Sequence, residues 1–197
     1  VFIISGPSGS GKDTVMTELF KKMPELLFSI SSITRAMRPG EREGEKYNFI
    51  TREKFEDMLK NDRLLEHNEF VGNYYGTPRE PVERAVANGQ DMVIEVDVNG
   101  AAQIREKMPE AVSIFIMPPS FAELKRRLSG RGTESEELIQ KRLASALGEI
   151  KRAAEYDYIV VNEDITAAAD NIMSVILSSR LKTDRQTKII DEVLSEC

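Results

Sequence analysis

Short apolar runs alternate with longer amphipathic segments along most of the chain. The runs cover residues 1–4, 26–30, 92–96, 112–117 and 158–161. Within each run the hydrophobicity is nearly continuous rather than alternating, which is typical of strands buried on both faces. We therefore predict an α/β protein whose central sheet is largely parallel and is covered by helices on both sides.

Helix starts are indicated by hydroxyl side chains, which can accept hydrogen bonds from the first amides of a helix. Four such residues stand at predicted helix starts: Thr51, Ser120, Thr133 and Thr166. Ser120 and Thr133 are each followed three residues later by glutamate, the pattern of a capping box. We expect helices over residues 14–22, 121–128 and 134–154.

Two segments interrupt the alternation of strands and helices. Residues 31–47 are rich in Arg, Glu and Gly, and residues 47–77 contain short runs that are broken by Gly72 and Gly76. This predicts an inserted subdomain of small antiparallel strands. The second segment, residues 130–133, is a glycine–arginine loop between two predicted helices.

Composition narrows the range of partners. The chain has 197 residues, enough for one domain with a sizeable core, and a formal net charge of −6. That charge argues against a broad basic face for nucleic acid but not against a local anion site. No apolar run approaches the ~20 residues that cross a bilayer. With one cysteine, Cys197, we expect no disulfide framework, a cytoplasmic setting and no obligate protein partner.

A glycine-rich loop follows the first predicted strand. Residues 6–12 read Gly-Pro-Ser-Gly-Ser-Gly-Lys and lead into a predicted helix. In this context glycines allow successive backbone N–H groups to approach phosphate oxygens, the helix N-terminus adds partial positive charge, and Lys12 can reach the β and γ phosphates. The loop therefore predicts a binding site for a nucleoside triphosphate.

The residue after this lysine departs from the usual motif. A Ser or Thr that ligands Mg²⁺ is typical there, whereas this chain has Asp13 followed by Thr14. Asp13 can contact the metal through water, or it can point outward and stabilise the first helical turn. We favour a water-mediated or outward placement.

A second set of polar residues follows the second predicted strand. Arg35 and Arg38 could grip a phosphate, with Glu41 orienting them, although such a trio alone is more often a solvated surface. Glu95 and Asp97 alternate on an otherwise apolar strand, where a carboxylate is costly unless it is paired or lies near a metal. Together with Glu66, these residues favour a second anionic ligand.

At this point the sequence resembles the guanylate kinase family over essentially its whole length. The matching motifs lie at residues 6–12, 31–41, 72–77, 94–100, 118–120, 130–134, 141–143 and 160–162, with Tyr47 and Glu66 between them. The resemblance implies a phosphate-loop core of three layers around a parallel sheet (residues 1–30, 91–119 and 157–197), an inserted GMP-binding subdomain (about 31–90) and a helical lid (about 120–156). It also implies the reaction ATP + GMP → ADP + GDP, with dGMP as a further acceptor and Mg²⁺ accompanying ATP.

The resemblance assigns roles residue by residue. ATP would be bound by Ser8, Gly9, Ser10, Gly11, Lys12, Asp13, Thr14 and Asn162. GMP would be bound by Ser31, Arg35, Arg38, Glu41, Tyr47, Glu66, Tyr75, Thr77, Glu95 and Asp97. Catalysis would rest on Lys12, Arg35, Arg127, Arg131 and Arg142, and the metal would be reached through water by Asp13 and Asp97.

Two other functions stay open at this stage. One is a non-catalytic guanylate-kinase-like module that binds peptides in the GMP cleft, against which the intact loop with Lys12 and the full set of arginines argue. The other is a phosphate-loop kinase for another nucleotide or small molecule, against which the placement of Glu66 and Thr77 speaks.

Overall fold

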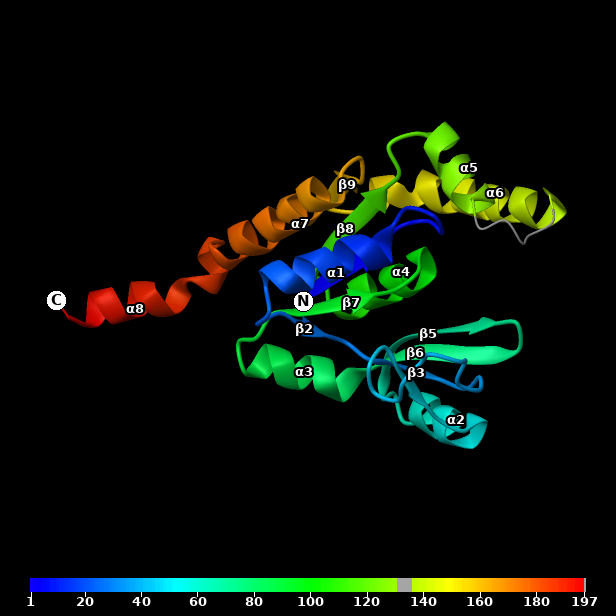
Figure 1. The fold of residues 1–197 in the computed structure, drawn as a ribbon. Coiled ribbons are helices and arrows are strands. Elements are labelled where there is room, and N and C mark those ends of the chain that lie inside the picture. Colours follow the sequence, from blue (N-terminus) through cyan, green and yellow to red (C-terminus); the bar gives the residue numbers. More distant parts are fainter. Residues whose placement is uncertain (131–135, 197) are drawn as a thin grey trace.

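The computed structural model describes residues 1–130 and 136–196. Its central sheet has five parallel strands in the order β2-β7-β1-β8-β9 (Figure 1). The strands are β1 (Phe2–Ser5), β2 (Leu27–Phe28), β7 (Met92–Glu95), β8 (Val112–Met117) and β9 (Tyr158–Val161). The predicted α/β class with a parallel sheet is therefore confirmed.

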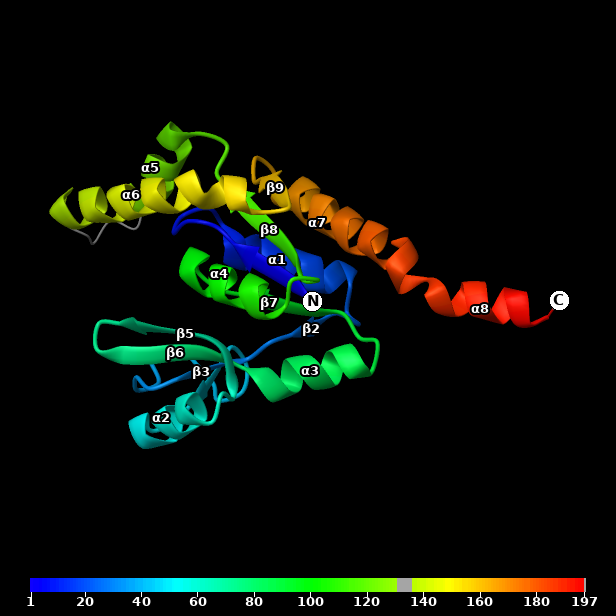
Figure 2. The same ribbon diagram turned by 180° about the vertical axis from the view of Figure 1, so that it is seen from behind.

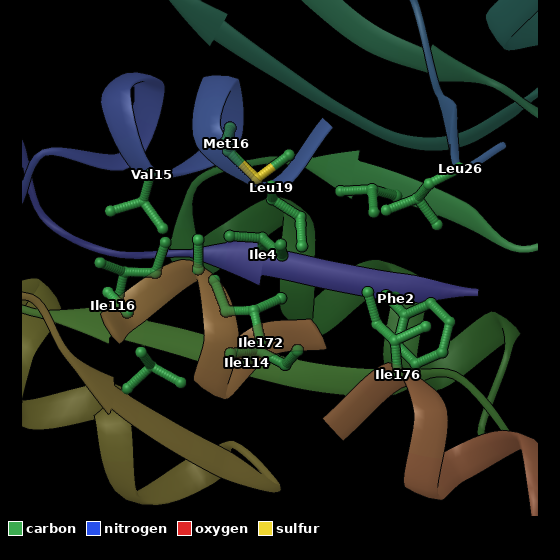
Figure 3. Close-up of a cluster of buried hydrophobic side chains, with 14 of the residues drawn as sticks. Phe2, Ile4, Val15, Met16, Leu19, Leu26, Ile114, Ile116, Ile172 and Ile176 are labelled. Atoms are coloured by element: carbon green, nitrogen blue, oxygen red, sulfur yellow. The ribbon is translucent and has the colours of Figure 1, made fainter. Parts of the chain in front are cut away.

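Helices cover both faces of this sheet, because successive side chains of a strand point to opposite sides. Phe2 and Ile4 of β1 pack in one cluster with α1 (Lys12–Lys22) and α7 (Ile165–Arg180), as Figure 3 shows. Ile3 packs in a second cluster with α3 (Arg79–Ala87) and α4 (Val98–Lys107). The result is the expected three-layer core.

A second, four-stranded sheet has the order β4-β3-β6-β5 and lies beside the β2 edge of the first (Figures 1 and 2). Its strands are β3 (Ser31–Ile33), β4 (Tyr47–Phe49), β5 (Leu64–Phe70) and β6 (Asn73–Pro78). Helix α2 (Arg52–Lys60) begins at Thr51, as predicted, and stacks Phe55 on Tyr74 with ring centroids 5.2 Å apart. β3 and β4 pair in parallel, so the expectation of purely antiparallel strands is wrong for that pair.

Helices α5 (Phe121–Ser129) and α6 (Glu136–Lys151) pack against each other beyond the end of β8. Their shared apolar cluster contains Leu124, Leu128, Ile139, Leu143 and Ala146. A 3₁₀ turn, η1 (Arg152–Glu155), returns the chain to β9. Leu138 and Leu147 of α6 are less well covered, at 44% and 42% exposed.

The chain ends in η2 (Thr183–Arg185) and α8 (Thr187–Ser195), which project away from the rest of the molecule (Figures 1 and 2). No helix among the described residues is long and apolar enough to cross a membrane.

Three details of the predicted elements need correction. Helix α1 begins at Lys12 rather than Thr14, because its amides continue directly from the glycine loop. Helix α7 is capped by Asp164, whose carboxylate accepts from the N–H of Ala167, and not by Thr166. The second strand is shorter than expected. The predicted cap at Thr133 lies outside the described residues.

Candidate active site

A cleft of about 760 Å³ opens between the phosphate loop, the second sheet and helices α5 and α6. Most of the predicted site residues line it: Ser8, Gly9, Gly11, Lys12, Asp13, Thr14, Ser31, Arg35, Arg38, Tyr47, Glu66, Tyr75, Glu95, Asp97, Arg127 and Arg142. Four others are not among the lining residues: Ser10, Thr77 and Asn162, which are buried, and Glu41, whose side chain is 26% exposed. Arg131 lies outside the described residues.

The loop before α1 has a backbone that only glycine fits at two points. At Gly6, with φ of 155°, an added Cβ would stand 2.3 Å from the carbonyl oxygen of Ile116. At Gly11, with φ of 87°, it would stand 2.4 Å from Nδ2 of Asn162. The loop can therefore lie directly on the sheet edge and turn its amides toward an anion.

Lys12 folds back over this loop. Its Nζ donates a 2.5 Å hydrogen bond to the carbonyl of Gly6. Burial lowers the pKa of this ammonium group, whereas the carboxylates of Glu95 and Glu149 raise it. The lysine is thus held at the loop before any ligand arrives, in the position from which it can meet phosphate oxygens.

Asn162 supports the loop from below rather than lining the cleft. Its side chain is 2% exposed, and Nδ2 donates to the carbonyl of Ser10 at 2.7 Å. Arg127 Nη1 donates to the same carbonyl at 3.1 Å, and Nη2 donates to the carbonyl of Asn162 at 3.2 Å. The end of β9 and the helix α5 are therefore tied to one point of the loop.

Two arginines reach the loop from the α5–α6 pair. Arg127 is oriented by Glu123, which accepts from its Nε at 2.7 Å. Arg142 of α6 donates from Nη2 to the hydroxyl of Ser8 at 2.8 Å. Both guanidinium groups line the cleft at the phosphate loop, so they can share the charge of a bound phosphate chain.

Arg35 is held by a forked contact in the second sheet. Its Nη1 and Nη2 donate to the two carboxylate oxygens of Glu41 at 2.7 and 2.6 Å. Glu41 also accepts from the backbone N–H of Arg38 at 2.7 Å. These contacts, with that of Arg35 first, lower the pKa of Glu41 to about 2. Arg35 also lies over the rings of Tyr47 and Phe49, 5.5 and 5.6 Å from their centroids.

Glu66 lines the cleft with its side chain almost fully buried. It is 5% exposed, and Oε1 accepts a 2.7 Å hydrogen bond from the hydroxyl of Thr77. Burial raises the pKa of Glu66 to about 7, against the opposing effect of the Thr77 hydrogen bond. The sequence did not indicate Gly100, where an added Cβ would stand 2.8 Å from Glu66 Oε2.

Asp97 has a structural role that the sequence analysis missed. It is the N-cap of α4, and Oδ1 accepts from the N–H groups of Asn99 and Gly100, both at 2.8 Å. Oδ2 accepts from Asn68 Nδ2 of β5 at 2.8 Å. An aspartate before a helical segment is a capping signal, but its place on an apolar strand drew attention to chemistry instead.

Glu95 and Asp13 meet through a lysine that sequence reasoning also missed. Lys46 Nζ lies 2.5 Å from Asp13 Oδ1 and 3.3 Å from Glu95 Oε2. Asp13 is 78% exposed and Glu95 is 14% exposed. Asp13 therefore lines the cleft and forms an ion pair with the residue that precedes β4.

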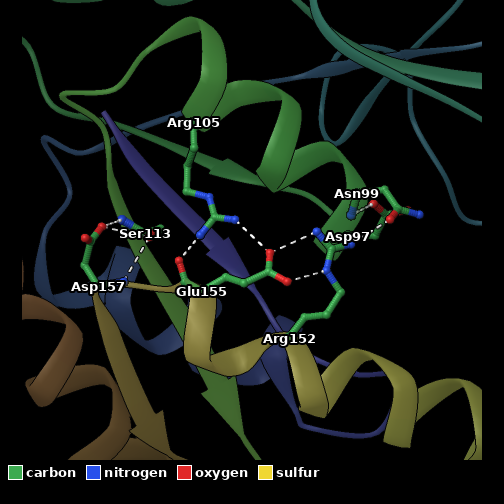
Figure 4. A network of polar contacts seen from close by, with 7 residues as sticks. All are labelled: Asp97, Asn99, Arg105, Ser113, Arg152, Glu155 and Asp157. Atoms are coloured by element: carbon green, nitrogen blue, oxygen red, sulfur yellow. Dashed lines mark hydrogen bonds and ion pairs between the residues drawn. The ribbon is translucent and has the colours of Figure 1, made fainter.

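The base of the α5–α6 pair is joined to α4 by a polar network (Figure 4). Glu155 of η1 is approached by Arg105 of α4 and by Arg152 from two sides. Arg152 also donates from Nη1 to Asn99 Oδ1 at 2.7 Å, one turn from the Asp97 cap. The last turn after α6 is thus fixed to the same helix end that borders Glu66.

Comparisons with known proteins agree with one another over nearly the whole chain. The family model described as guanylate kinase matches residues 1–179. A guanylate kinase of Oceanobacillus iheyensis is 47% identical over 196 residues, covering 100% of this chain and 95% of that protein. One of Escherichia coli strain K12 is 46% identical over 198 residues, covering 100% and 96%.

A solved structure gives the same answer. The crystal structure of guanylate kinase from Anaplasma phagocytophilum superimposes with a TM-score of 0.77 at 38% identity, covering 94% of this chain and 88% of that one. With a cleft that joins a phosphate loop to a buried carboxylate, and with relatives matched end to end, the chain belongs to the guanylate kinase family.

Proposed function

We propose that this chain transfers the γ-phosphoryl group of ATP to GMP, or to dGMP, giving ADP and the nucleoside diphosphate. The observation that carries this is that one cleft is lined both by Lys12 of the phosphate loop and by the buried carboxylate of Glu66. Both substrates are small molecules, and we propose that the protein acts in the cytoplasm without a nucleic acid or an obligate protein partner.

Glu66 would select the base. Guanine alone among the common bases presents N1–H and an exocyclic amino group side by side, and a carboxylate can accept both, whereas adenine presents an acceptor at N1. Thr77, which donates to Glu66 Oε1, keeps that carboxylate oriented, and Ser31 and Asp97 lie nearby in the cleft wall. Because a wrong base would leave buried polar groups unpaired, discrimination against AMP should be large.

The phosphate of GMP would be held by Arg35, Arg38, Tyr47 and Tyr75. Glu41 does not face the cleft, and its forked contact with Arg35 supports an orienting role. Since the attacking oxygen belongs to an ionised phosphate, the reaction requires no general base. The protein's contribution is to place this oxygen in line with the γ-phosphorus of ATP.

The phosphates of ATP would lie on the loop of residues 8–14. Its backbone N–H groups and Lys12 would bind the β and γ oxygens, while Arg127 and Arg142 would spread the charge that develops during transfer. Asn162 would act on ATP indirectly, through the carbonyl of Ser10 that it holds.

The oxygen donors near the loop fit Mg²⁺, which keeps several waters and takes one or two carboxylates together with substrate phosphates. No group of three or more His, Cys, Asp or Glu side chains that could hold a metal ion by themselves occurs among the described residues. We propose that Asp13 and Asp97 would hold the ion, each through water. When bound, it would neutralise charge on the phosphates of ATP.

The three parts would move relative to one another during turnover. We propose a core of residues 1–30, 91–119 and 157–197, a GMP-binding subdomain of about 31–90 and a lid of about 120–156. Closure of the last two over both nucleotides would exclude water and prevent hydrolysis of ATP.

The test is ADP release from ATP measured with GMP, dGMP, AMP, CMP and UMP as acceptors. We expect turnover with GMP and dGMP and little with the others. Comparable turnover with AMP would contradict the role of Glu66. If no acceptor causes ADP release, a non-catalytic interaction module is favoured. If another acceptor is preferred over GMP, a kinase of different specificity is favoured.

A further inference from the structure

Lys46 stands where the two predicted nucleotide sites meet. It precedes Tyr47, the first residue of β4, and its Nζ forms an ion pair with Asp13, the residue after Lys12. Lys12 and Tyr47 are both proposed to bind phosphate, Lys12 that of ATP and Tyr47 that of GMP. The residues next to them in the sequence, Asp13 and Lys46, contact each other at 2.5 Å.

The contact also joins the two sheets. Asp13 belongs to the first turn of α1, and Glu95 is the last residue of β7 in the parallel sheet. Lys46 enters from the second sheet and meets both carboxylates, at 2.5 and 3.3 Å. One ammonium group thus fixes the edge of β4 against the core at the mouth of the cleft.

Charge gives this contact its importance. Two carboxylates beside a site for the phosphates of ATP and GMP repel these ligands unless a cation neutralises the carboxylates. Lys46 provides that cation, because its Nζ lies 2.5 Å from Asp13 Oδ1 and 3.3 Å from Glu95 Oε2. Glu95 is only 14% exposed, so water screens its charge poorly and the cation matters more than at an exposed pair.

We propose that Lys46 is a positioning residue that couples the two nucleotide sites. Its ion pair with Asp13 makes its position depend on the conformation of the phosphate loop. Because Tyr47 is the next residue in the chain, the position of Lys46 also sets that of Tyr47. A bound ATP therefore favours the arrangement of β4 that binds GMP, and by linkage GMP favours ATP to the same extent. The inference rests on the proposed function. It assigns a role to Asp13, the unusual aspartate after Lys12, as the partner of Lys46 in this coupling.

The experiment measures the affinity for GMP by titration calorimetry, with and without a saturating non-hydrolysable ATP analogue. We expect the analogue to tighten GMP binding to the wild-type protein by about 2- to 150-fold, the range spanned by interaction energies between residues in contact. Lys46→Gln should lose most of this gain, and Lys46→Arg, which keeps the charge, should retain most of it. Lys60→Gln, a change at an exposed lysine of α2, should retain all of it.

A double-mutant cycle tests the route through Asp13. If the ion pair carries the coupling, Lys46→Gln combined with Asp13→Asn should lose no more of the gain than Lys46→Gln alone. Additive losses, an undiminished gain in Lys46→Gln, or no gain in the wild-type protein would each overturn the inference. Turnover of the wild-type protein with ATP and GMP is scored separately, since its absence would overturn the proposed function instead.

Discussion

The carboxylate of Glu66 accepts a hydrogen bond from the hydroxyl of Thr77 at 2.7 Å, and both side chains are almost entirely shielded from water. One carboxylate oxygen is thereby fixed. Burial dominates this environment and raises the pKa of Glu66 to about 7, so the group that would read guanine changes charge within the physiological range.

The affinity for GMP should therefore depend on pH. Guanine N1–H and N2–H donate hydrogen bonds, so they require the ionised carboxylate, and binding must release a proton from any molecule in which Glu66 is protonated. Between pH 6 and pH 8 the Kd for GMP should fall about tenfold. Calorimetry in buffers of different ionisation enthalpy measures both the affinity and the proton release. In Glu66→Gln, GMP should bind weakly and without this pH dependence. A wild-type profile that is flat over this range would contradict the assignment.

The free energy of unfolding should fall as pH rises, whereas the affinity for GMP should increase. A carboxyl group with a raised pKa in the folded protein binds more protons there than in the unfolded chain. The contribution of Glu66 is therefore fully present below its unfolded pKa of 4.5 and is lost as pH rises to about 7. The loss is on the order of 3 kcal/mol. Urea unfolding at pH 5 and pH 8 should show this difference in the wild-type protein relative to Glu66→Gln. Equal pH dependence in both would contradict it.

Gly100 should tolerate no side chain, although it lies in a helix. An added Cβ would stand 2.8 Å from Glu66 Oε2 and 3.1 Å from Val96 Cβ, so Gly100→Ala should displace the carboxylate. We expect the KM for GMP to rise about 10- to 100-fold, with the KM for ATP nearly unchanged. The matched control is Gly148→Ala in α6, where no atom lies within 4 Å of the added Cβ. That variant should gain ~0.5–1 kcal/mol of stability and keep its activity. Equal kinetics of the two variants would contradict the expectation.

The sequence was sufficient for the elements whose signal is local. Continuous apolar runs predicted β8 and β9 with their observed bounds. β8 is buried on both faces, as such a run indicates, whereas the edge strand β9 leaves Tyr158, Ile159 and Val161 partly exposed. The loop at residues 6–12 was also predicted correctly, because its closely spaced glycines followed by lysine are recognisable in the sequence itself.

Features that depend on contacts between distant parts of the chain could not be predicted from the sequence. Lys46 looked like one charge among many in an Arg- and Glu-rich segment, and only tertiary structure brings it to Asp13. Asp97 lines the cleft, as its place after an apolar strand indicated, and it is also the cap of α4, which that pattern did not predict. Asn162 contacts the backbone of the phosphate loop, a partner that lies far away in the sequence. These features share one cause, because periodicity predicts which residues are buried but not which residues meet.

The link between Glu41 and Arg35 should show in GMP binding alone. Glu41→Gln keeps the shape of the side chain but removes the charge that holds the guanidinium fork. We expect the KM for GMP to rise about tenfold, with the KM for ATP unchanged. Because the pKa of Glu41 is about 2, the effect should be constant from pH 5 to pH 9. Glu45→Gln, in the same loop and 61% exposed, is the control and should behave as wild type. A rise in both KM values would mean that Glu41 does more than orient Arg35.

Replacing Asn162 should affect the KM for ATP rather than the KM for GMP, because this residue contacts the phosphate loop. Asn162→Ala removes the 2.7 Å hydrogen bond to the carbonyl of Ser10 and leaves a gap beneath the phosphate loop. The loss of a buried hydrogen bond should cost about 1–3 kcal/mol in the free energy of unfolding. The KM for ATP should rise about tenfold while the KM for GMP changes little, since Arg127 Nη1 alone then holds the Ser10 carbonyl. Asn171→Ala, on the exposed face of α7, controls for the loss of an amide side chain. A variant that melts lower but keeps the wild-type KM for ATP would show that Asn162 supports the fold without positioning the loop.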